Sequence, residues 1–65
     1  MRKAEEVRVD SLKPGDCFED EYQTGYAVIG PNEKDGEPMI ESMVKFSGEP
    51  MLWHPESHVY HITYE

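Results

Sequence analysis

The chain has 65 residues, of which 14 are acidic and 6 are basic, for a net charge of −8 at neutral pH. This length allows one small domain, residues 1–65, and a chain so short buries only about 60% of the surface that it exposes when unfolded. The acidic excess disfavours direct binding to DNA or RNA, which needs clustered Lys and Arg, and no stretch reaches the roughly 18 apolar residues that a membrane span needs.

The N-terminal part predicts one strand and one tight turn. Apolar and polar residues alternate over 6–10, which predicts a half-buried strand, and we expect residues 1–5 to be frayed. Pro14-Gly15 has the signature of a type II turn, because proline presets the first central φ and glycine supplies the positive φ at the second. After this turn the chain is expected to run back in a short apolar segment at 17–18, which is not counted as a strand.

The second predicted strand covers 22–29. Gly25 inside it indicates a bulge or a tight bend of a barrel, and Gly30-Pro31 is expected to end it. Residues 32–36 then form the tip of a hairpin. The tip closes with Asp35-Gly36, a favoured turn pair because both residues tolerate positive φ.

The third predicted strand covers 37–46. This segment could form a single helix, but reading it with a period of two places Ile40, Val44 and Phe46 on one face, which favours a half-buried strand. A turn at 47–49 follows.

Two strands complete the chain. Residues 49–54 predict a fourth strand, and Pro50 restricts it to an edge position or a strand start. The connection at 55–57 is expected to form one short 3-10 turn. Residues 59–64 are rich in β-branched and aromatic residues, which predicts the last strand.

The chain carries an LKPGDxF turn at 12–18 and a PxSxV turn at 55–59. In these motifs it resembles small SH3-like β-barrel proteins, many of them uncharacterised phage or actinobacterial proteins. The resemblance spans most of the chain and implies an all-β, five-stranded SH3-like barrel. It carries over no functional residue, because fold does not determine function.

The acidity belongs to the body of the domain. Residues 16–65 hold 11 acidic and 2 basic residues, so this part is almost purely anionic. Such a surface fits a basic partner protein. We expect its centre at the acidic run of Asp16, Glu19, Asp20 and Glu21.

The lone cysteine, Cys17, excludes an intrachain disulfide and a four-cysteine zinc site. This agrees with a reducing compartment and a cytoplasmic protein, in the host cytoplasm if a phage encodes the chain. An activated thiol needs cationic neighbours, whereas the residues flanking Cys17 are acidic. We therefore expect no enzymatic activity and no cofactor.

The three histidines, His54, His58 and His61, lie within eight residues, and imidazole is a common metal ligand. On a helix they would share a face. Pro55 and the β-branched tail argue against a helix, and in a strand His58 and His61 point to opposite sides. Surface histidines without a bound metal are the expected outcome, and the three remain weak metal candidates.

An apolar surplus is expected on the outer face of the sheet. If the alternation of faces along the strand places Leu52 in the core, then Met43, Met51 and Trp53 face outward. Together with Tyr60 they could form a contact patch. The alternative is that a bulge reverses one strand and that Trp53 belongs to the core. Both interpretations stay open at this point.

Three functions follow from these features. The first is a non-enzymatic protein-binding module, in a phage an accessory protein that modulates a host protein through the acidic surface and the aromatic patch. The second is a structural subunit that self-assembles into a homo-oligomer through exposed strand edges. The third is metal binding through the histidines.

Overall fold

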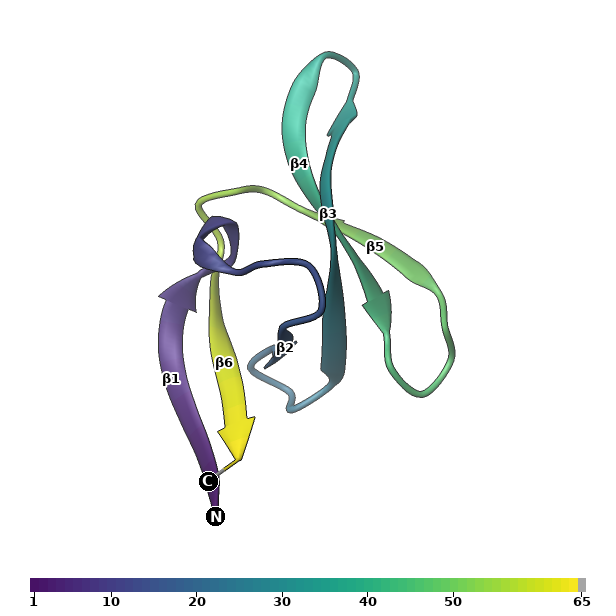
Figure 1. The fold of residues 1–65 in the computed structure, drawn as a ribbon. Coiled ribbons are helices and arrows are strands. Elements are labelled where there is room, and N and C mark those ends of the chain that lie inside the picture. The colour runs from purple at the N-terminus through teal and green to yellow at the C-terminus, as the bar shows by residue number, and fades with distance from the viewer. Residues whose placement is uncertain (65) are drawn as a thin grey trace.

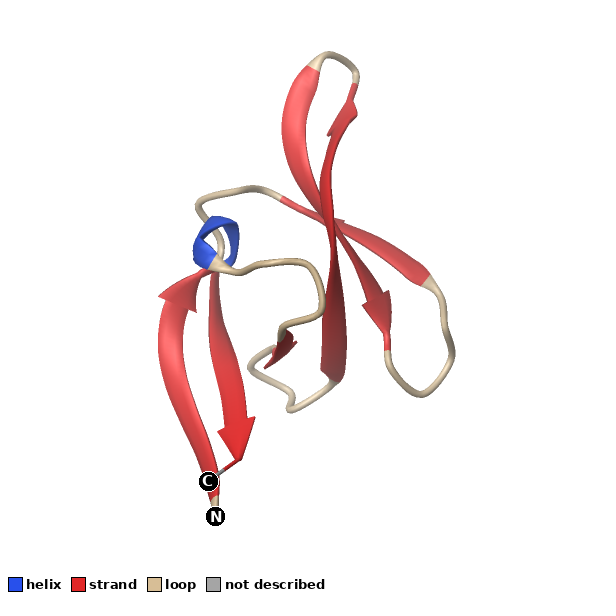
Figure 2. Ribbon diagram, viewed as in Figure 1, coloured by secondary structure: helices blue, strands red, loops and turns tan. Residues whose placement is uncertain are grey.

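The structure, a computed structural model, describes residues 1–64 as one antiparallel sheet of six strands with a single 3-10 turn (Figures 1 and 2). The strand order is β1-β6-β2-β3-β4-β5, which places β1 and β5 at the two edges. The elements are β1 (Arg2–Arg8), η1 (Val9–Ser11), β2 (Cys17–Glu19), β3 (Gly25–Lys34), β4 (Glu37–Val44), β5 (Pro50–Trp53) and β6 (His58–Tyr64).

The all-β class is confirmed, but the five-stranded barrel is wrong. The segment expected as a short return is a sixth strand, β2, which lies inside the sheet between β3 and β6. Phe18 explains this position, because its side chain is fully buried and its backbone pairs with Tyr26 on one side and His61 on the other. The sheet is also open, since no pairing joins β1 to β5 within residues 1–64.

The N-terminal strand begins earlier than the sequence pattern indicates. Residues 2–5, which we expected to be frayed, pair with the end of β6, starting at Arg2 opposite Tyr64. The strand also ends earlier, at Arg8, because a 3-10 turn begins at Val9, in which Leu12 N–H donates to the Val9 carbonyl at 3.2 Å. The Val9 N–H still continues the register with β6, since it donates to the carbonyl of Ser57 at 2.8 Å.

The 3-10 turn lies at Val9–Ser11 and not at 55–57, where it was predicted. The connection between β5 and β6 is instead a tight turn in which Ser57 N–H donates to the His54 carbonyl at 2.9 Å. The 3-10 turn holds this connection in place, because Asp10 N–H donates to the carbonyl of Pro55 at 3.2 Å.

Both predicted glycine turns are confirmed. Gly15 has a φ of 94°, and Asp16 N–H donates to the Lys13 carbonyl at 3.0 Å, as in a type II turn. Asp35 and Gly36 have φ values of 53° and 80° and form a two-residue hairpin loop between β3 and β4.

The β3 strand is longer than predicted. It starts at Gly25 and passes through Gly30-Pro31, where we expected its end, to Lys34. The bulge predicted at Gly25 lies between Val28 and Gly30, where Ile29 has no partner on β4. Beyond the bulge, the β3–β4 hairpin extends away from the rest of the sheet (Figure 1).

The core covers one face of the sheet, here called the inner face. Trp53 packs against this core, because the register puts it opposite Ile40, which also contacts the core. Phe46, predicted to be in the core, lies in the turn after β4 and is 85% exposed. The buried cluster consists of Val9, Phe18, Tyr26, Val28 and Val59.

Candidate partner-binding groove

An open groove of about 530 Å³ lies where the loop between β2 and β3 approaches β5 and the start of β6. We call it the acidic groove. It combines aromatic and carboxylate side chains from four different segments of the chain. Its lining residues are Glu6, Asp20, Glu21, Tyr22, Met51, Trp53, Ser57, His58 and Tyr60.

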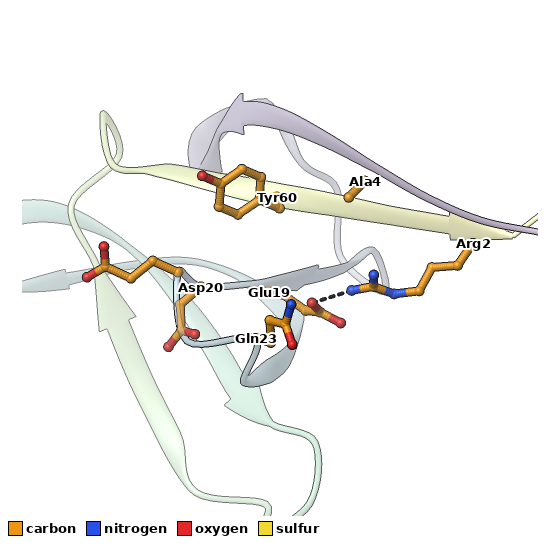
Figure 3. Close-up of a pocket in the computed structure, with 7 residues that line it drawn as sticks. Arg2, Ala4, Glu19, Asp20, Gln23 and Tyr60 are labelled. Carbon is orange, nitrogen blue, oxygen red and sulfur yellow. Dashed lines mark hydrogen bonds and ion pairs between the residues drawn. The ribbon is translucent and has the colours of Figure 1, made fainter.

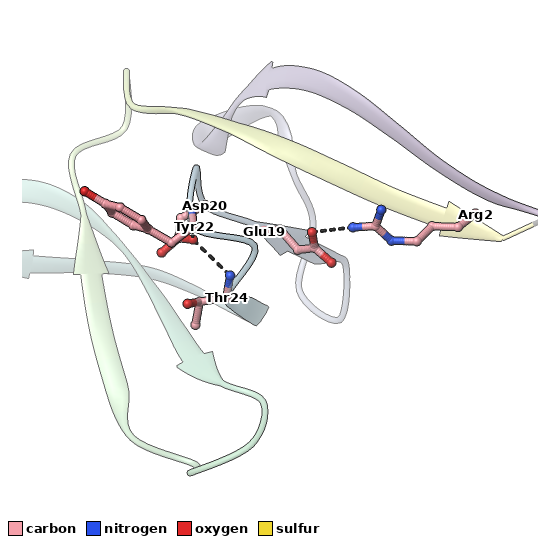
Figure 4. Close-up of polar contacts among 5 residues, drawn as sticks. All are labelled: Arg2, Glu19, Asp20, Tyr22 and Thr24. Atoms are coloured by element: carbon pink, nitrogen blue, oxygen red, sulfur yellow. Dashed lines mark hydrogen bonds and ion pairs between the residues drawn. The ribbon is translucent and has the colours of Figure 1, made fainter.

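The aromatic rings of the groove are accessible. Tyr22 is 81% exposed, and its ring reaches out from the loop toward β5 (Figure 4). Tyr60 of β6 is 39% exposed and Met51 of β5 is 41% exposed. These side chains therefore offer apolar surface to a partner without any rearrangement of the core.

Trp53 connects the groove to the core. Its ring makes edge contacts with Phe18 and Tyr26, at centroid distances of 5.5 and 5.2 Å. Its Nε1–H donates to Ser42 Oγ at 2.8 Å, and this hydroxyl, on a fully buried residue, donates onward to the Met51 carbonyl at 3.1 Å. The indole is thus held by packing and by a hydrogen bond while it also lines the groove.

Asp20 shapes the loop that carries Tyr22. One carboxylate oxygen accepts the backbone N–H groups of Tyr22 at 2.9 Å and Thr24 at 3.0 Å (Figure 4). The other oxygen accepts the hydroxyl of Tyr26 at 2.9 Å. The loop also contains Gln23 in the left-handed region, with a φ of 65°. Asp20 therefore ties the loop to the core, in addition to its charge in the groove.

A second hollow of about 270 Å³ lies next to the acidic groove and shares Asp20, Glu21 and Tyr60 with it (Figure 3). Glu19 lines this hollow and accepts a hydrogen bond from Arg2. The bond to Glu19 raises the pKa of the Arg2 guanidinium above its ordinary value. Because Arg2 balances its charge, Glu19 adds less negative potential than the unpaired carboxylate of Glu21.

The charge of the acidic groove is one-sided. Its described lining contains the carboxylates of Glu6, Asp20 and Glu21 but no Lys or Arg. The imidazole of His58 lies near Glu6, with Nδ1 to Oε2 at 3.8 Å, and carries charge only when protonated. At neutral pH the groove is therefore an anionic surface lined with aromatic rings.

The groove brings together most of the residues predicted for partner binding, namely Asp20, Glu21, Met51, Trp53 and Tyr60. Glu19 lies beside it. Met43 and Asp16 do not take part.

Met43 lies on the opposite face of β4 from its buried neighbour Ser42, so the expected patch of Met43, Met51 and Trp53 is divided between two faces. Asp16 lies in the Pro14-Gly15 turn, where its carboxylate accepts the Lys13 backbone N–H at 2.9 Å.

Two residues that line the groove were not among those predicted from the sequence: Tyr22, which supplies an aromatic ring, and Glu6, which supplies a carboxylate. Tyr22 directly follows the acidic run, so its position beside Glu21 was a usable signal. Glu6 could not be found this way, because only the pairing of β1 with β6, which sets Glu6 opposite Tyr60, brings it to the groove.

The histidines do not meet at one site. His54 lines a separate hollow with Lys34 and Glu37, whereas His58 lines the acidic groove. Within residues 1–64, no three His, Cys, Asp or Glu side chains are grouped to hold a metal ion. The half-buried Cys17 has a cationic neighbour that sequence analysis did not foresee, Lys45, whose Nζ lies 3.5 Å from Sγ.

Tyr26 gives the domain a pH dependence above neutrality. Burial, followed by the hydrogen bond to Asp20, raises the pKa of its hydroxyl above the ordinary value of 10.0. A raised pKa in the folded state means that the stabilisation is complete below about pH 10 and is lost as the pH rises through the folded value. We expect alkaline titration of tyrosinate absorbance to show one late tyrosine, with a matching loss of stability. Both effects should disappear in Tyr26→Phe, and an unchanged titration in that variant would contradict the assignment.

In comparisons with known proteins, no family model, no curated protein and no solved structure matches the chain. Within the described residues, no helix has the length and apolar character needed to cross a membrane. The resemblance to SH3-like barrels therefore stays a prediction, and the acidic groove is the feature of the chain that bears on its function.

Proposed function

We propose that the chain is a non-enzymatic binding module whose acidic groove takes a basic segment of a partner protein. One observation carries the proposal: exposed aromatic rings and three carboxylates line one groove that has no Lys or Arg in its described lining. If a phage encodes the chain, the partner is a host protein that it modulates in the host cytoplasm.

The physical chemistry of the groove suits Lys and Arg side chains. A cation over the face of Trp or Tyr gains about 0.5–2 kcal/mol, depending on how far it is desolvated. The carboxylates of Glu6 and Glu21 add attraction and raise the rate of encounter with a cationic partner. Tyr22 and Tyr60 supply aromatic contact area at a low cost in side-chain entropy, as in many interfaces.

A fluorescence titration tests the proposal. Trp53 is the only tryptophan and lines the groove, so it reports binding directly. We expect a lysine oligopeptide to change its emission and to bind more weakly as salt rises. The double variant Glu6→Gln with Glu21→Gln should raise the Kd roughly twofold to thirtyfold, because each exposed charge contributes about 0.2–1 kcal/mol.

The matched control is Glu33→Gln with Glu37→Gln, two exposed carboxylates on the β3–β4 hairpin that do not line the acidic groove. This control changes the net charge by the same amount and should leave the Kd nearly unchanged. Equal weakening by both double variants would show general charge attraction and would contradict a binding site in the groove.

Self-assembly through strand edges is the second candidate, because the open sheet leaves β1 and β5 as edge strands. The β1 edge discourages pairing between copies, because five of its seven residues are charged. The β5 edge carries no charged side chain, so the groove beside it decides which partner it accepts. Two copies that each carry a net charge of −8 repel each other, which favours the basic partner over a second copy of the chain.

A further inference from the structure

We infer that the partner segment binds as an added strand on the outer edge of β5, with Lys or Arg at every second position directed into the acidic groove. This inference rests on the proposed function and adds to it the conformation and sequence pattern of the ligand. It uses the sheet edge that directly borders the groove.

The β5 strand combines an edge position with a place in the groove. It pairs with β4 on one side and ends the strand order on the other. Met51 and Trp53, two residues apart on this strand, both line the acidic groove. A strand laid along β5 would therefore place every second side chain beside them, on the groove side of the sheet.

The pairing of β4 with β5 shows which backbone groups face outward. The N–H of Val44 donates to the Glu49 carbonyl at 2.8 Å, one step beyond the pair of Met43 with Pro50. Hydrogen-bonded and non-hydrogen-bonded pairs alternate along an antiparallel ladder. Counting from that bond, Met51 and Trp53 turn their backbone groups toward β4.

Leu52 lies between these two residues and is thus a non-hydrogen-bonded partner of Glu41. Its backbone N–H and C=O consequently point to the outer edge of β5. One donor and one acceptor on a single residue are the pair of groups that an added strand uses. Pro50 has no backbone N–H to donate. The two outward groups of Leu52 would therefore fix the register of the added strand against β5.

Charge decides between the possible occupants. Side chains of an added strand that face the groove meet Glu21 and Glu6, together with the aromatic rings. A second copy of this chain brings a net charge of −8, whereas a strand with alternate Lys or Arg is complementary to the groove. Lys and Arg also carry apolar stems that can cover Met51 and Tyr60 while their charged ends reach the carboxylates.

Peptides of one composition and different patterns test the inference on the full chain. The probe is an alternating Lys-Val peptide, and its control carries the same lysines and valines in two blocks. We expect the alternating peptide to quench or shift Trp53 emission with at least about a tenfold lower Kd, a difference that corresponds to 1.4 kcal/mol. The backbone N–H groups of the bound peptide should point alternately toward β5 and away from it. N-methylation of the set that faces β5 should abolish binding, and N-methylation of the set that faces away should have little effect.

Amide hydrogen exchange at β5 gives the second readout. At a peptide concentration of about 100 Kd, exchange of the Leu52 N–H should slow roughly 100-fold. The N–H groups of Met51 and Trp53, which face β4, should change little. The double variant Glu33→Gln with Glu37→Gln should behave as the unmodified chain in both experiments.

The outcomes separate this inference from the proposed function. Salt-dependent binding in the groove, with unchanged Leu52 exchange and tolerance of both methylation patterns, would overturn the added strand while the basic partner stands. Absence of binding by every lysine peptide would overturn both. Slow Leu52 exchange that depends on the concentration of the chain alone would identify a second copy as the occupant, and so overturn the inference.

Discussion

Replacing Trp53 by alanine is expected to lower the free energy of unfolding by about 3–5 kcal/mol, the usual cost of removing a packed aromatic ring. The variant loses the ring contacts with Phe18 and Tyr26 and leaves the buried Ser42 hydroxyl without its donor. A domain of 65 residues has a total stability of roughly 3–10 kcal/mol. We therefore expect urea unfolding, followed by far-ultraviolet circular dichroism, to show that Trp53→Ala has lost a third or more of the stability of the unmodified chain, with a much lower urea midpoint.

Two further variants show which part of the indole matters. Trp53→Phe keeps an aromatic ring but removes the N–H donor to Ser42, so it should lose about 1–2 kcal/mol. Phe46→Ala also removes an aromatic ring, but from a side chain that is 85% exposed, and should change stability by less than about 0.5 kcal/mol. Equal stability of Trp53→Ala and Phe46→Ala would refute the role of Trp53 in the core.

The two glycine turns of this protein could be predicted from the sequence, because their chemistry is local. Pro14-Gly15 and Asp35-Gly36 adopt the backbone angles that these residue pairs favour. The position of β2 could not be predicted in this way. Three residues carry no periodicity of their own, and only the burial of Phe18 between β3 and β6 makes them a central strand.

The phase of β5 stayed open in the sequence for a similar reason. Leu52 and Trp53 are adjacent and both apolar, so alternation alone cannot decide which one faces the core. The structure settles the phase, since the Trp53 ring packs against Phe18 and Tyr26 and its N–H donates to the buried Ser42 hydroxyl. Ser42 lies between Ile40 and Val44 in the period-two pattern, but the hydropathy of a serine does not indicate that it is fully buried.

The acidic run was interpreted only as surface charge, although its members have different functions. Asp16 and Asp20 accept backbone N–H groups in two turns, and Glu19 pairs with Arg2. Glu21 is the exposed member with no structural contact of this kind, and it lines the groove. Composition reports the number of carboxylates, but their separate roles depend on which turns and strands lie beside them.

Asp20→Ala is the second variant with a large expected effect. It removes the acceptor for two backbone N–H groups of the loop and for the hydroxyl of the buried Tyr26. Hydrogen bonds to a charged group contribute about 1.5–3 kcal/mol each, but the loop can rebind water when released. We therefore expect a total loss of about 2–3 kcal/mol in urea unfolding, with slower binding of the lysine peptide because Tyr22 is no longer held at the groove.

Two neighbouring substitutions separate structure from charge in this loop. Asp20→Asn keeps one oxygen for the backbone N–H groups and should retain most of the stability that Asp20→Ala loses. Glu21→Ala removes a charge from an exposed residue, so it should weaken peptide binding and change stability by less than about 0.5 kcal/mol. If Asp20→Ala were as stable as Glu21→Ala, the loop would not depend on the Asp20 carboxylate, and Tyr22 would have to be positioned by contacts across the groove.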